Sequence, residues 1–590
     1  MKTDNILFVI LPFVASAVML TVIQAPISWS LLAWVSLVPF ILACSADAKP
    51  RRLALVSYVI SVFYWLGNLY WIVPVTIAGW IAFCLYTAAL WPILALCLRY
   101  CRIKKIPLFL ASAVLVVGIE RMQGFFLGGF FWRFLAHSQY QNITLIQIAD
   151  IFGTAGISFL IAMVNGLLAE LIIAVARKNI FKIIQLPKLA LVCAAVVAAI
   201  IYGRWRISQE DQCVQPGPLV ASLQSNVPQS VKRTFESGEE LFNGLMEHSK
   251  ASAEAGAELI VWPETMVQAI LDTSIWPILV SAEDSKAFDK ALKEHSKDTA
   301  FVLVGAYGGQ IKQDDSEPYL ARYNSAFLYR TDGQKDNSRY DKIHLVPFGE
   351  FLPFRKSCRW LYNILMKFTP YNYDYSLDAG SEYTVFEMAG QDQATQVYPI
   401  RSHTSEERPA KGKNSNGAYK FGVMICYEDT VPAIARRFAL DKQDTKRLDW
   451  LVNISNDGWF VRFKDGKVLP SAELAQHTTV CAFRAVENRL AILRSVNTGI
   501  SCLIDSSGRI RNGFLAGTLP PNTMARTGMP GWFLDRVPID RRITFFSKFG
   551  EWLGFCCEVC LILFIIVSLS ARFFKTRKYK TRLAGKLNGT

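Results

Sequence analysis

The feature that most constrains this chain is a series of apolar runs, each near the length of a membrane-spanning helix. Eight runs stand out, at residues 6–23, 27–46, 53–73, 75–98, 106–123, 154–175, 186–203 and 552–571. A helix needs about 20 apolar residues to cross a hydrocarbon layer of ~30 Å. No small-residue cleavage site follows the first run, so we interpret it as an uncleaved span. The sequence therefore predicts a membrane domain of about seven spans in residues 1–207 and a last span in 549–590.

Basic residues in the loops between these runs predict the orientation of the chain. Lysine and arginine gather in every second loop, at residues 49–52, 99–105 and 177–182, and again after the last run, at 572–582. Cytoplasmic loops are the ones enriched in these residues. We therefore expect both termini in the cytoplasm and the long polar region 208–548 on the opposite face of the membrane.

The net charge of +15 has the same origin. Residues 204–550 carry 42 Lys and Arg against 41 Asp and Glu, so the excess lies in the membrane region. This distribution argues against a nucleic-acid partner. The thirteen cysteines lack the regular spacing of a disulfide scaffold. The six histidines are scattered singly without metal-ligand spacing, and we expect neither a metal site nor a cofactor.

Residues 124–153 interrupt the apolar series with glycine, aromatic and charged side chains, namely Gly124, Gly128, Gly129, Trp132, Arg133, His137 and Asp150. Two interpretations are open for this segment. It is either an interfacial loop with an aromatic belt or a re-entrant floor beneath the polar domain. We favour the floor, because glycine-rich, aromatic and basic residues together suit a lipid headgroup.

From about residue 218 the pattern changes to short apolar strands that alternate with helices. Strands are predicted at 219–227, 259–262, 300–307, 323–329, 421–425, 450–455 and 490–496, helices at 234–256, 283–297 and 471–489, and a hairpin at 503–510. Apolar strands in alternation with helices indicate an α/β sandwich whose strands are buried on both faces. The polar stretch 389–420 is predicted to be a surface insertion.

One cysteine, Cys426, ends the apolar strand 421–425, and two carboxylates, Glu428 and Asp429, follow it closely. On its own, a cysteine in such a place is more often a core residue than a nucleophile. It can act as a nucleophile if a base and a cation lie nearby. The question is therefore whether other strand ends supply a base and a cation.

Two other strand ends carry such residues. Glu264 follows the strand 259–262, and Lys342 precedes a Pro/Gly loop that leads to Glu350. Taken separately, Glu264 suits a helix N-cap and Lys342 a solvated surface position. Taken together with Cys426, they predict an acyl-transfer site. A glutamate can remove the thiol proton, a lysine can stabilise the thiolate and an oxyanion, and a second nucleophile would resolve the thioester.

The contexts of these residues resemble the nitrilase superfamily, whose domain is an αββα sandwich with a Glu-Lys-Cys triad. The whole chain resembles the membrane-bound branch of that superfamily, the bacterial apolipoprotein N-acyltransferase family. The resemblance rests on the membrane topology together with the stretches 224–230 (QSNVPQS), 259–264, 342–354 (KIHLVPFGEFLPF), 426–428, 454–460 (ISNDGWF) and 476–498. It therefore covers nearly the whole chain.

The resemblance implies a role for each residue of the predicted site. Glu264 would be the general base, Lys342 the stabiliser of the thiolate and the oxyanion, and Cys426 the nucleophile. Three further residues would support the site, by orienting the base or the lysine or by acting on the second substrate: Glu350, Tyr427 and Glu428.

The resemblance also implies substrates and a location. A phospholipid, typically phosphatidylethanolamine, would donate its sn-1 acyl chain to the cysteine. The amine of the S-diacylglyceryl cysteine of an apolipoprotein would then receive it. The catalytic domain would lie in the periplasm, on a bacterial inner membrane. The residues leave two alternatives open: a membrane-tethered nitrilase-type amidase, in which water resolves the thioester, and a non-catalytic scaffold that binds lipid or lipoprotein.

The chain departs from the family pattern at three places. Residues 461–464 (VRFK) stand where a small glycine-containing turn is expected, 389–420 is longer than usual, and 529–548 is an extended, basic segment. These departures bear on lid shape and on substrate preference. Mobile lids are predicted at 345–375 and 456–470.

Overall fold

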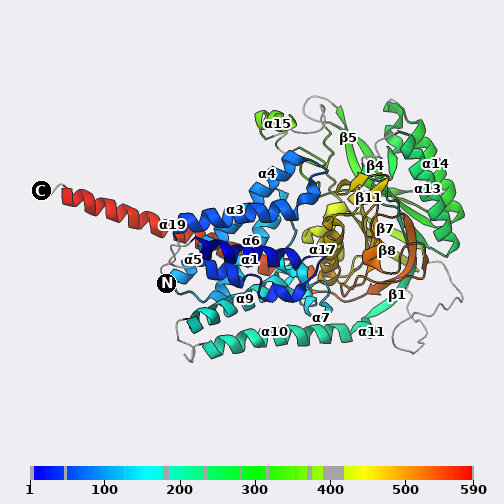
Figure 1. Ribbon diagram of the computed structural model, residues 1–590. Coiled ribbons are helices and arrows are strands. Elements are labelled where there is room, and N and C mark those ends of the chain that lie inside the picture. The colour runs from blue at the N-terminus through cyan, green and yellow to red at the C-terminus, as the bar shows by residue number, and fades with distance from the viewer. Residues whose placement is uncertain are drawn as a thin grey trace.

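The structure is a computed structural model that describes residues 6–44, 49–125, 128–176, 185–229, 235–279, 281–313, 318–352, 354, 357–367, 375–389 and 417–587. It divides into a bundle of helices and an α/β sandwich (Figure 1). The bundle contains α1 (Leu7–Val22), α3 (Pro50–Asn68), α4 (Ile77–Ala88), α5 (Leu90–Ile103), α6 (Leu108–Phe125), α9 (Thr154–Ala176), α10 (Gln185–Ser208) and α19 (Trp552–Leu587). Helix α1 starts, and α19 ends, on the side of the bundle away from the sandwich (Figure 1).

Several of these helices have the properties of membrane spans. By length and composition, four helices among the described residues can cross a membrane: Ile77–Ile103, Leu108–Phe125, Thr154–Ala176 and Leu186–Cys213. Shorter apolar helices include Leu7–Val22 and Trp552–Ser568. Large apolar side chains on the bundle are exposed, among them Leu11 at 61%, Leu191 at 57% and Val567 at 62%. Such a surface suits contact with lipid rather than with water.

One of the predicted spans, 27–46, is not a single helix. The run 27–46 holds a 3₁₀ turn, η1 (Ser30–Trp34), and a short helix, α2 (Val38–Ala43). Asn165 of α9 satisfies the backbone groups that this break leaves free, accepting from the Leu37 N–H at 2.8 Å and donating to the Ala33 carbonyl at 2.9 Å. In the run 75–98, α4 and α5 follow each other within the helical stretch Ile77–Ile103, and Ala89 between them keeps helical dihedral angles.

The sandwich has four layers, with two sheets between two pairs of helices, as predicted. The larger sheet has the strand order β14-β15-β1-β2-β4-β5-β6, with β3 (Val267–Ile270) beside β4, and the smaller has the order β13-β12-β9-β8-β7. Helices α13 (Phe235–Glu254) and α14 (Glu283–Asp298) cover the larger sheet, and α16 (Pro432–Ala439) and α17 (Ala472–Asn488) cover the smaller (Figure 1). This is the αββα arrangement.

The strands of the larger sheet are β1 (Val214–Gln224), β2 (Leu259–Val261), β4 (Phe301–Gln313), β5 (Pro318–Tyr329), β6 (Lys335–Asp341), β14 (Ala516–Gly517) and β15 (Gly531–Asp540). Those of the smaller sheet are β7 (Val385–Ala389), β8 (Ala418–Ile425), β9 (Trp450–Ser455), β12 (Ala491–Val496) and β13 (Cys502–Ile504). Strand β1 shows why such strands are apolar throughout. Leu219 and Leu223 face the covering helices, whereas Val220 faces the core between the sheets. On that inner face Ser222 donates to the Arg494 carbonyl of β12 at 2.9 Å, which joins the two sheets.

The stretch 529–548, expected to be a basic extension, contains an interior strand instead. Strand β15 pairs antiparallel with β1 along its whole length, from Val214↔Asp540 to Gln224↔Gly531. The predicted insertion 389–420 connects two paired strands, since β7 and β8 lie side by side as a hairpin. Residues 390–416 of this insertion lie outside the described residues.

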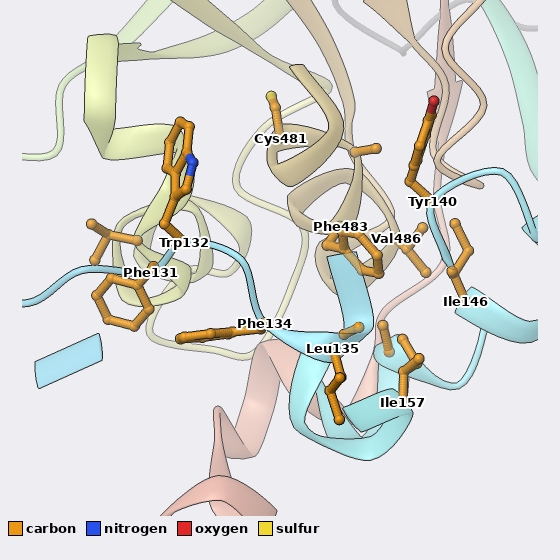
Figure 2. Close-up of a cluster of buried hydrophobic side chains, with 14 of the residues drawn as sticks. Phe131, Trp132, Phe134, Leu135, Tyr140, Ile146, Ile157, Cys481, Phe483 and Val486 are labelled. Atoms are coloured by element: carbon orange, nitrogen blue, oxygen red, sulfur yellow. The ribbon is translucent and has the colours of Figure 1, made fainter. Parts of the chain in front are cut away.

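Residues 128–152 join the helical bundle to the sandwich. Figure 2 shows side chains of this segment gathered with those of α17 and α9: Phe131, Trp132, Phe134, Leu135, Tyr140, Ile146, Ile157, Cys481, Phe483 and Val486. The Trp132 indole N–H donates to Gln476 Oε1 at 2.7 Å, and the side chain is only 2% exposed. The segment therefore packs beneath the sandwich, in agreement with the floor rather than with an aromatic belt in contact with lipid.

A buried group of charges reinforces this junction. Asp150 of α8 (Ala149–Phe152) accepts from Arg206 of α10 and from Arg489 at the end of α17, both at 2.7 Å. The Tyr202 hydroxyl donates to the same carboxylate at 2.7 Å. The side chains of Asp150 and Arg489 are 1% and 0% exposed. A single carboxylate thus binds a helix of the bundle and a helix of the sandwich.

Candidate active site

Cys426 lies where β8 ends and the chain turns into a 3₁₀ helix, η6 (Cys426–Thr430). Its φ is +55°, a left-handed conformation that is costly for a residue other than glycine. The residue is 9% exposed, and Asn453 of β9 donates to its carbonyl at 3.1 Å. The turn thus holds the thiol at the carboxyl end of the parallel pair β8 and β9, where α/β sheets commonly bind ligands.

Glu264 follows β2 and is 5% exposed. Its Oε1 accepts from the Asn324 side chain at 2.6 Å, and its Oε2 accepts from the Asn456 backbone N–H at 2.8 Å. Gly305 of β4 lies directly against its backbone, since a Cβ at that position would come within 2.7 Å of Glu264 Cα. Both oxygens and the backbone are therefore held in place.

Lys342 directly follows β6 and is 1% exposed. Its Nζ lies 2.9 and 2.8 Å from the two carboxylate oxygens of Glu350 and 3.6 Å from Glu264 Oε1. The Asn324 side-chain amide donates to both carboxylates, at 2.6 Å to Glu264 and 2.9 Å to Glu350. One lysine, two carboxylates and one amide thus form a single hydrogen-bonded group.

The charges of this group act on the Cys426 thiol. Burial raises the pKa of Cys426 above its ordinary value, Glu264 raises it further, and Lys342 opposes both effects. Burial also disfavours the Lys342 ammonium, but the surrounding negative groups, led by Glu350, outweigh burial and raise the pKa of the lysine. At neutral pH the lysine is therefore charged and the thiol keeps its proton until a base removes it.

The sequence predicted no role for Asn324 or for Asn456, which lies in the stretch 454–460, although both hold Glu264. Asn324 lies within the predicted strand 323–329, and Asn456 follows the strand 450–455. In the structure they are 3% and 1% exposed. Both residues carry an amide side chain within, or directly after, an apolar strand. Because a buried amide must have hydrogen-bond partners, this pattern could have indicated them from the sequence.

Glu428 is fully buried and accepts four hydrogen bonds. The donors lie at 2.7 to 2.9 Å and are the backbone N–H groups of Ile343, His344 and Ile425 and the hydroxyl of Tyr340. They adjoin Lys342 on one side and Cys426 on the other, so the carboxylate fixes the lysine relative to the thiol. Burial raises the pKa of Glu428 to about 7.

Tyr427 connects the turn at Cys426 to the floor segment. Its hydroxyl oxygen accepts from the Phe131 backbone N–H at 3.0 Å. Its ring stacks with Trp132 and with His344, at centroid distances of 6.4 and 5.9 Å. Burial raises the pKa of Tyr427 to about 12, so its hydroxyl stays protonated at neutral pH.

Three acidic residues surround His477 of α17, close to the turn at Cys426. Its Nε2 lies 2.8 Å from Asp429, and its Nδ1 lies 3.2 Å from Asp457 and 3.3 Å from Glu473. Asp429 and Asp457 outweigh burial and raise the pKa of His477. Asp457, Glu473 and His477 have the composition of a metal site, with ligand atoms within 4.8 Å of one another. Its ring nitrogens are hydrogen-bonded to Asp429 and Asp457, and we interpret the group as an ion-pair network. The i, i+4 spacing of Glu473 and His477 is its sequence signal.

The fold and this site define a carbon–nitrogen hydrolase domain, and residues 219–514 match the family described as Carbon-nitrogen hydrolase. Residues 16–167 match the Apolipoprotein N-acyltransferase N-terminal domain. An apolipoprotein N-acyltransferase of Geobacter metallireducens is 31% identical over 496 residues, 81% of this chain and 82% of the relative. Apolipoprotein N-acyltransferase 1 of Treponema denticola is 23% identical over 581 residues, 93% of each chain. The chain belongs to the apolipoprotein N-acyltransferase family, which confirms the predicted resemblance.

Among solved structures, an amidase from Nesterenkonia sp. is 15% identical and covers 55% of this chain and 92% of that chain, with a TM-score of 0.34.

Proposed function

We propose that this protein transfers a fatty acyl chain from a membrane phospholipid to the amine of the S-diacylglyceryl cysteine of an apolipoprotein, with Cys426 as the carrier. Membership of the family supports the reaction class over an amidase or a scaffold. One observation supports the assignment of residues. Glu264 Oε1 and Lys342 Nζ lie 3.6 Å apart, and both charges act on the Cys426 thiol. Phosphatidylethanolamine would be the typical donor.

In the first half-reaction, Glu264 takes the thiol proton of Cys426 as the sulfur attacks the sn-1 ester carbonyl. Lys342 stabilises the negative charge that develops on the carbonyl oxygen. When the tetrahedral intermediate collapses, the ester C–O bond breaks and Glu264 returns the proton to the departing glycerol oxygen. Lysophospholipid leaves, and the acyl chain remains on Cys426 as a thioester.

In the second half-reaction, the amine of the acceptor attacks the thioester carbonyl. Glu264 takes a proton from the amine nitrogen, and Lys342 again stabilises the oxyanion. Collapse breaks the C–S bond, and the proton passes from Glu264 to the thiolate. The products are an amide and the free Cys426 thiol, so the protein returns to its starting state.

The membrane arrangement follows the predicted domains. In this proposal residues 1–207 and 549–590 form the membrane part, and residues 208–548 form the catalytic domain in the periplasm, above a bacterial inner membrane. The N-terminal end of α1 and the C-terminal end of α19 are both on the side of the bundle away from the sandwich, which supports a cytoplasmic position for both termini (Figure 1).

Access to the thiol requires movement of the residues that cover it, since Cys426 is 9% exposed and Glu264 is 5% exposed. Residues 343–352 lie between the lysine and the floor segment. Within them, Pro347 is so close to Gly128 that a Cβ on the glycine would come within 2.8 Å of it. We propose that this loop separates from the floor segment to admit a lipid.

The test uses the purified protein in vesicles with phosphatidylethanolamine that carries a labelled sn-1 chain. Intact-mass measurement should show one acyl chain on Cys426 that hydroxylamine removes, and added diacylated lipopeptide should convert it to an amide. Cys426→Ala should lack both products. Cys358→Ala, which removes a partly exposed thiol of the same domain, should keep both. Free fatty acid without amide would indicate a hydrolase, and amide formation by Cys426→Ala would refute the carrier role.

A further inference from the structure

A small hairpin, formed by β10 (Arg462–Lys464) and β11 (Lys467–Leu469), stands outside both sheets of the sandwich. It occupies the place where the sequence departs from the family pattern. Asp465 and Gly466 turn the chain with φ of +52° and +73°, as a two-residue hairpin turn requires. A Cβ at Gly466 would meet nothing within 4 Å, so the tip stands in open space.

The register of this hairpin gathers three basic side chains on one face. Arg462 lies opposite Leu469, and Lys464 lies opposite Lys467. Opposite residues, and residues two apart along a strand, share a face, so these four side chains lie together, and Phe463 lies on the other face. All three basic residues are exposed, and none forms an ion pair with a carboxylate of the described part of the chain.

This basic face is directed toward the helical bundle. The Arg462 guanidinium lies 5.5 Å from the centre of the Tyr70 ring. Phe460, just before the hairpin, packs edge-on against Trp71 at 5.0 Å. Both aromatic residues belong to the turn η2 (Tyr70–Ile72) between α3 and α4, and Ile77 at the start of α4 is 61% exposed. Tyr70 is 48% exposed, and an exposed tyrosine at the end of a span marks the membrane–water interface. The basic face therefore lies at the level of lipid headgroups.

We infer that this hairpin binds anionic phospholipid headgroups at the membrane surface. Lys464 and Lys467 reach the phosphates, Arg462 lies against the interfacial ring of Tyr70, and Leu469 contacts the apolar boundary of the lipid. Each basic side chain near an anionic surface strengthens association about fivefold. The inference does not depend on the role of Cys426, because it rests on charge, register and position alone.

Photo-crosslinking locates the lipid directly. Photoreactive benzoylphenylalanine replaces Leu469 in a chain that also carries Cys426→Ala, so that acyl transfer cannot consume the lipid. The protein is placed in vesicles of phosphatidylcholine alone or of an equal mixture with phosphatidylglycerol. The matched control places the same group at Phe463, which is 47% exposed against 40% for Leu469 but lies on the opposite face. In the mixture, position 469 should capture phosphatidylglycerol at least about fivefold more than phosphatidylcholine, and position 463 should show no preference.

Two further arms test the electrostatic origin of the preference. Lys464→Glu with Lys467→Glu should reduce it at least about fivefold. Lys286→Glu with Lys290→Glu, on exposed positions of α14 at the far side of the sandwich, should leave it unchanged (Figure 1). High salt should weaken the preference in the chain with its natural lysines, a measurement that does not depend on the folding of any charge variant.

Equal capture of the two lipids at position 469 would overturn the inference. So would a preference that survives both charge reversal and high salt. Capture of an added acidic lipopeptide in place of lipid would also overturn it, because the hairpin would then be a protein-binding surface.

Discussion

Replacing Glu428 with glutamine should weaken the fold and slow acylation, because an amide cannot satisfy the donors around this position. Each carboxylate oxygen accepts two hydrogen bonds, at 2.7 to 2.9 Å. Glutamine keeps one oxygen, and its NH₂ group must face one of the two donor pairs. Turned toward Ile343 and His344, it meets two backbone N–H groups. Turned the other way, it meets the Ile425 N–H and the Tyr340 hydroxyl, which can rotate and accept. At least one buried N–H group therefore loses its partner.

The size of the effect follows from this count. A buried donor without a partner costs about 1–3 kcal/mol, and above pH 7, where Glu428 is ionised, loss of the charged acceptor also weakens the bonds that remain. We expect Glu428→Gln to lower the free energy of unfolding by about 2–4 kcal/mol. We also expect acylation of Cys426 to slow about 10–100-fold, because the carboxylate no longer fixes the thiol relative to Lys342.

Urea titration of tryptophan fluorescence in detergent measures the stability, and intact mass under single turnover measures the acylation rate. The control is Glu387→Gln, on the exposed side of β7, where the carboxylate pairs with Lys420 at 3.0 Å. An exposed pair of this kind contributes less than about 1 kcal/mol. If Glu428→Gln changed neither quantity more than Glu387→Gln does, the proposed role of Glu428 would be refuted.

Three further predictions concern the surroundings of the site. Gly305→Ala should slow acylation about tenfold or more in single turnover, since its Cβ would lie 2.7 Å from Glu264 Cα and displace the proposed base. Asn324→Leu should slow acylation but leave the circular dichroism spectrum unchanged, because both carboxylates lose a donor. An undiminished acylation rate in either variant would contradict the assigned geometry. The contribution of Glu428 to the free energy of unfolding should fall as pH rises from 4.5 to 7, because folded Glu428, with a pKa of about 7, keeps a proton that the unfolded chain releases. A slope equally steep in Glu428→Gln would exclude this origin.

The residues of the proposed triad could be suggested from the sequence because each has a local signature. Glu264 and Cys426 directly follow apolar strands, and Lys342 precedes a Pro/Gly loop. Apolar strands that alternate with helices also predicted the sandwich, since the strands had to be buried on both faces. What brings the three residues together is the packing of two sheets; their residue types predicted a shared site, and the resemblance to a known family supplied the sandwich that forms it.

Features that depend on distant partners could not be predicted. Strand β15 was not predicted, because 529–548 contains basic residues and its partner β1 lies some three hundred residues earlier. Asn324 looks like any polar residue of a strand until the sheets bring Glu264 and Glu350 to its amide. The break in the run 27–46 is stabilised by a hydrogen bond from the Leu37 N–H to Asn165, which lies 128 residues later. A hydropathy pattern cannot indicate such a contact.

The shared carboxylate at Asp150 has a consequence for the modularity of this protein. Arg489 of the sandwich is 0% exposed, and the carboxylate that it binds belongs to the membrane part. A sandwich produced alone from residues 208–548 would keep the arginine and lose that counter-charge, and stranding one partner of a buried pair costs about 3–5 kcal/mol. The sandwich should therefore be less stable when it is produced without the membrane part. A chimera that exchanges it between relatives should fold only if the junction residues of both parts are exchanged together.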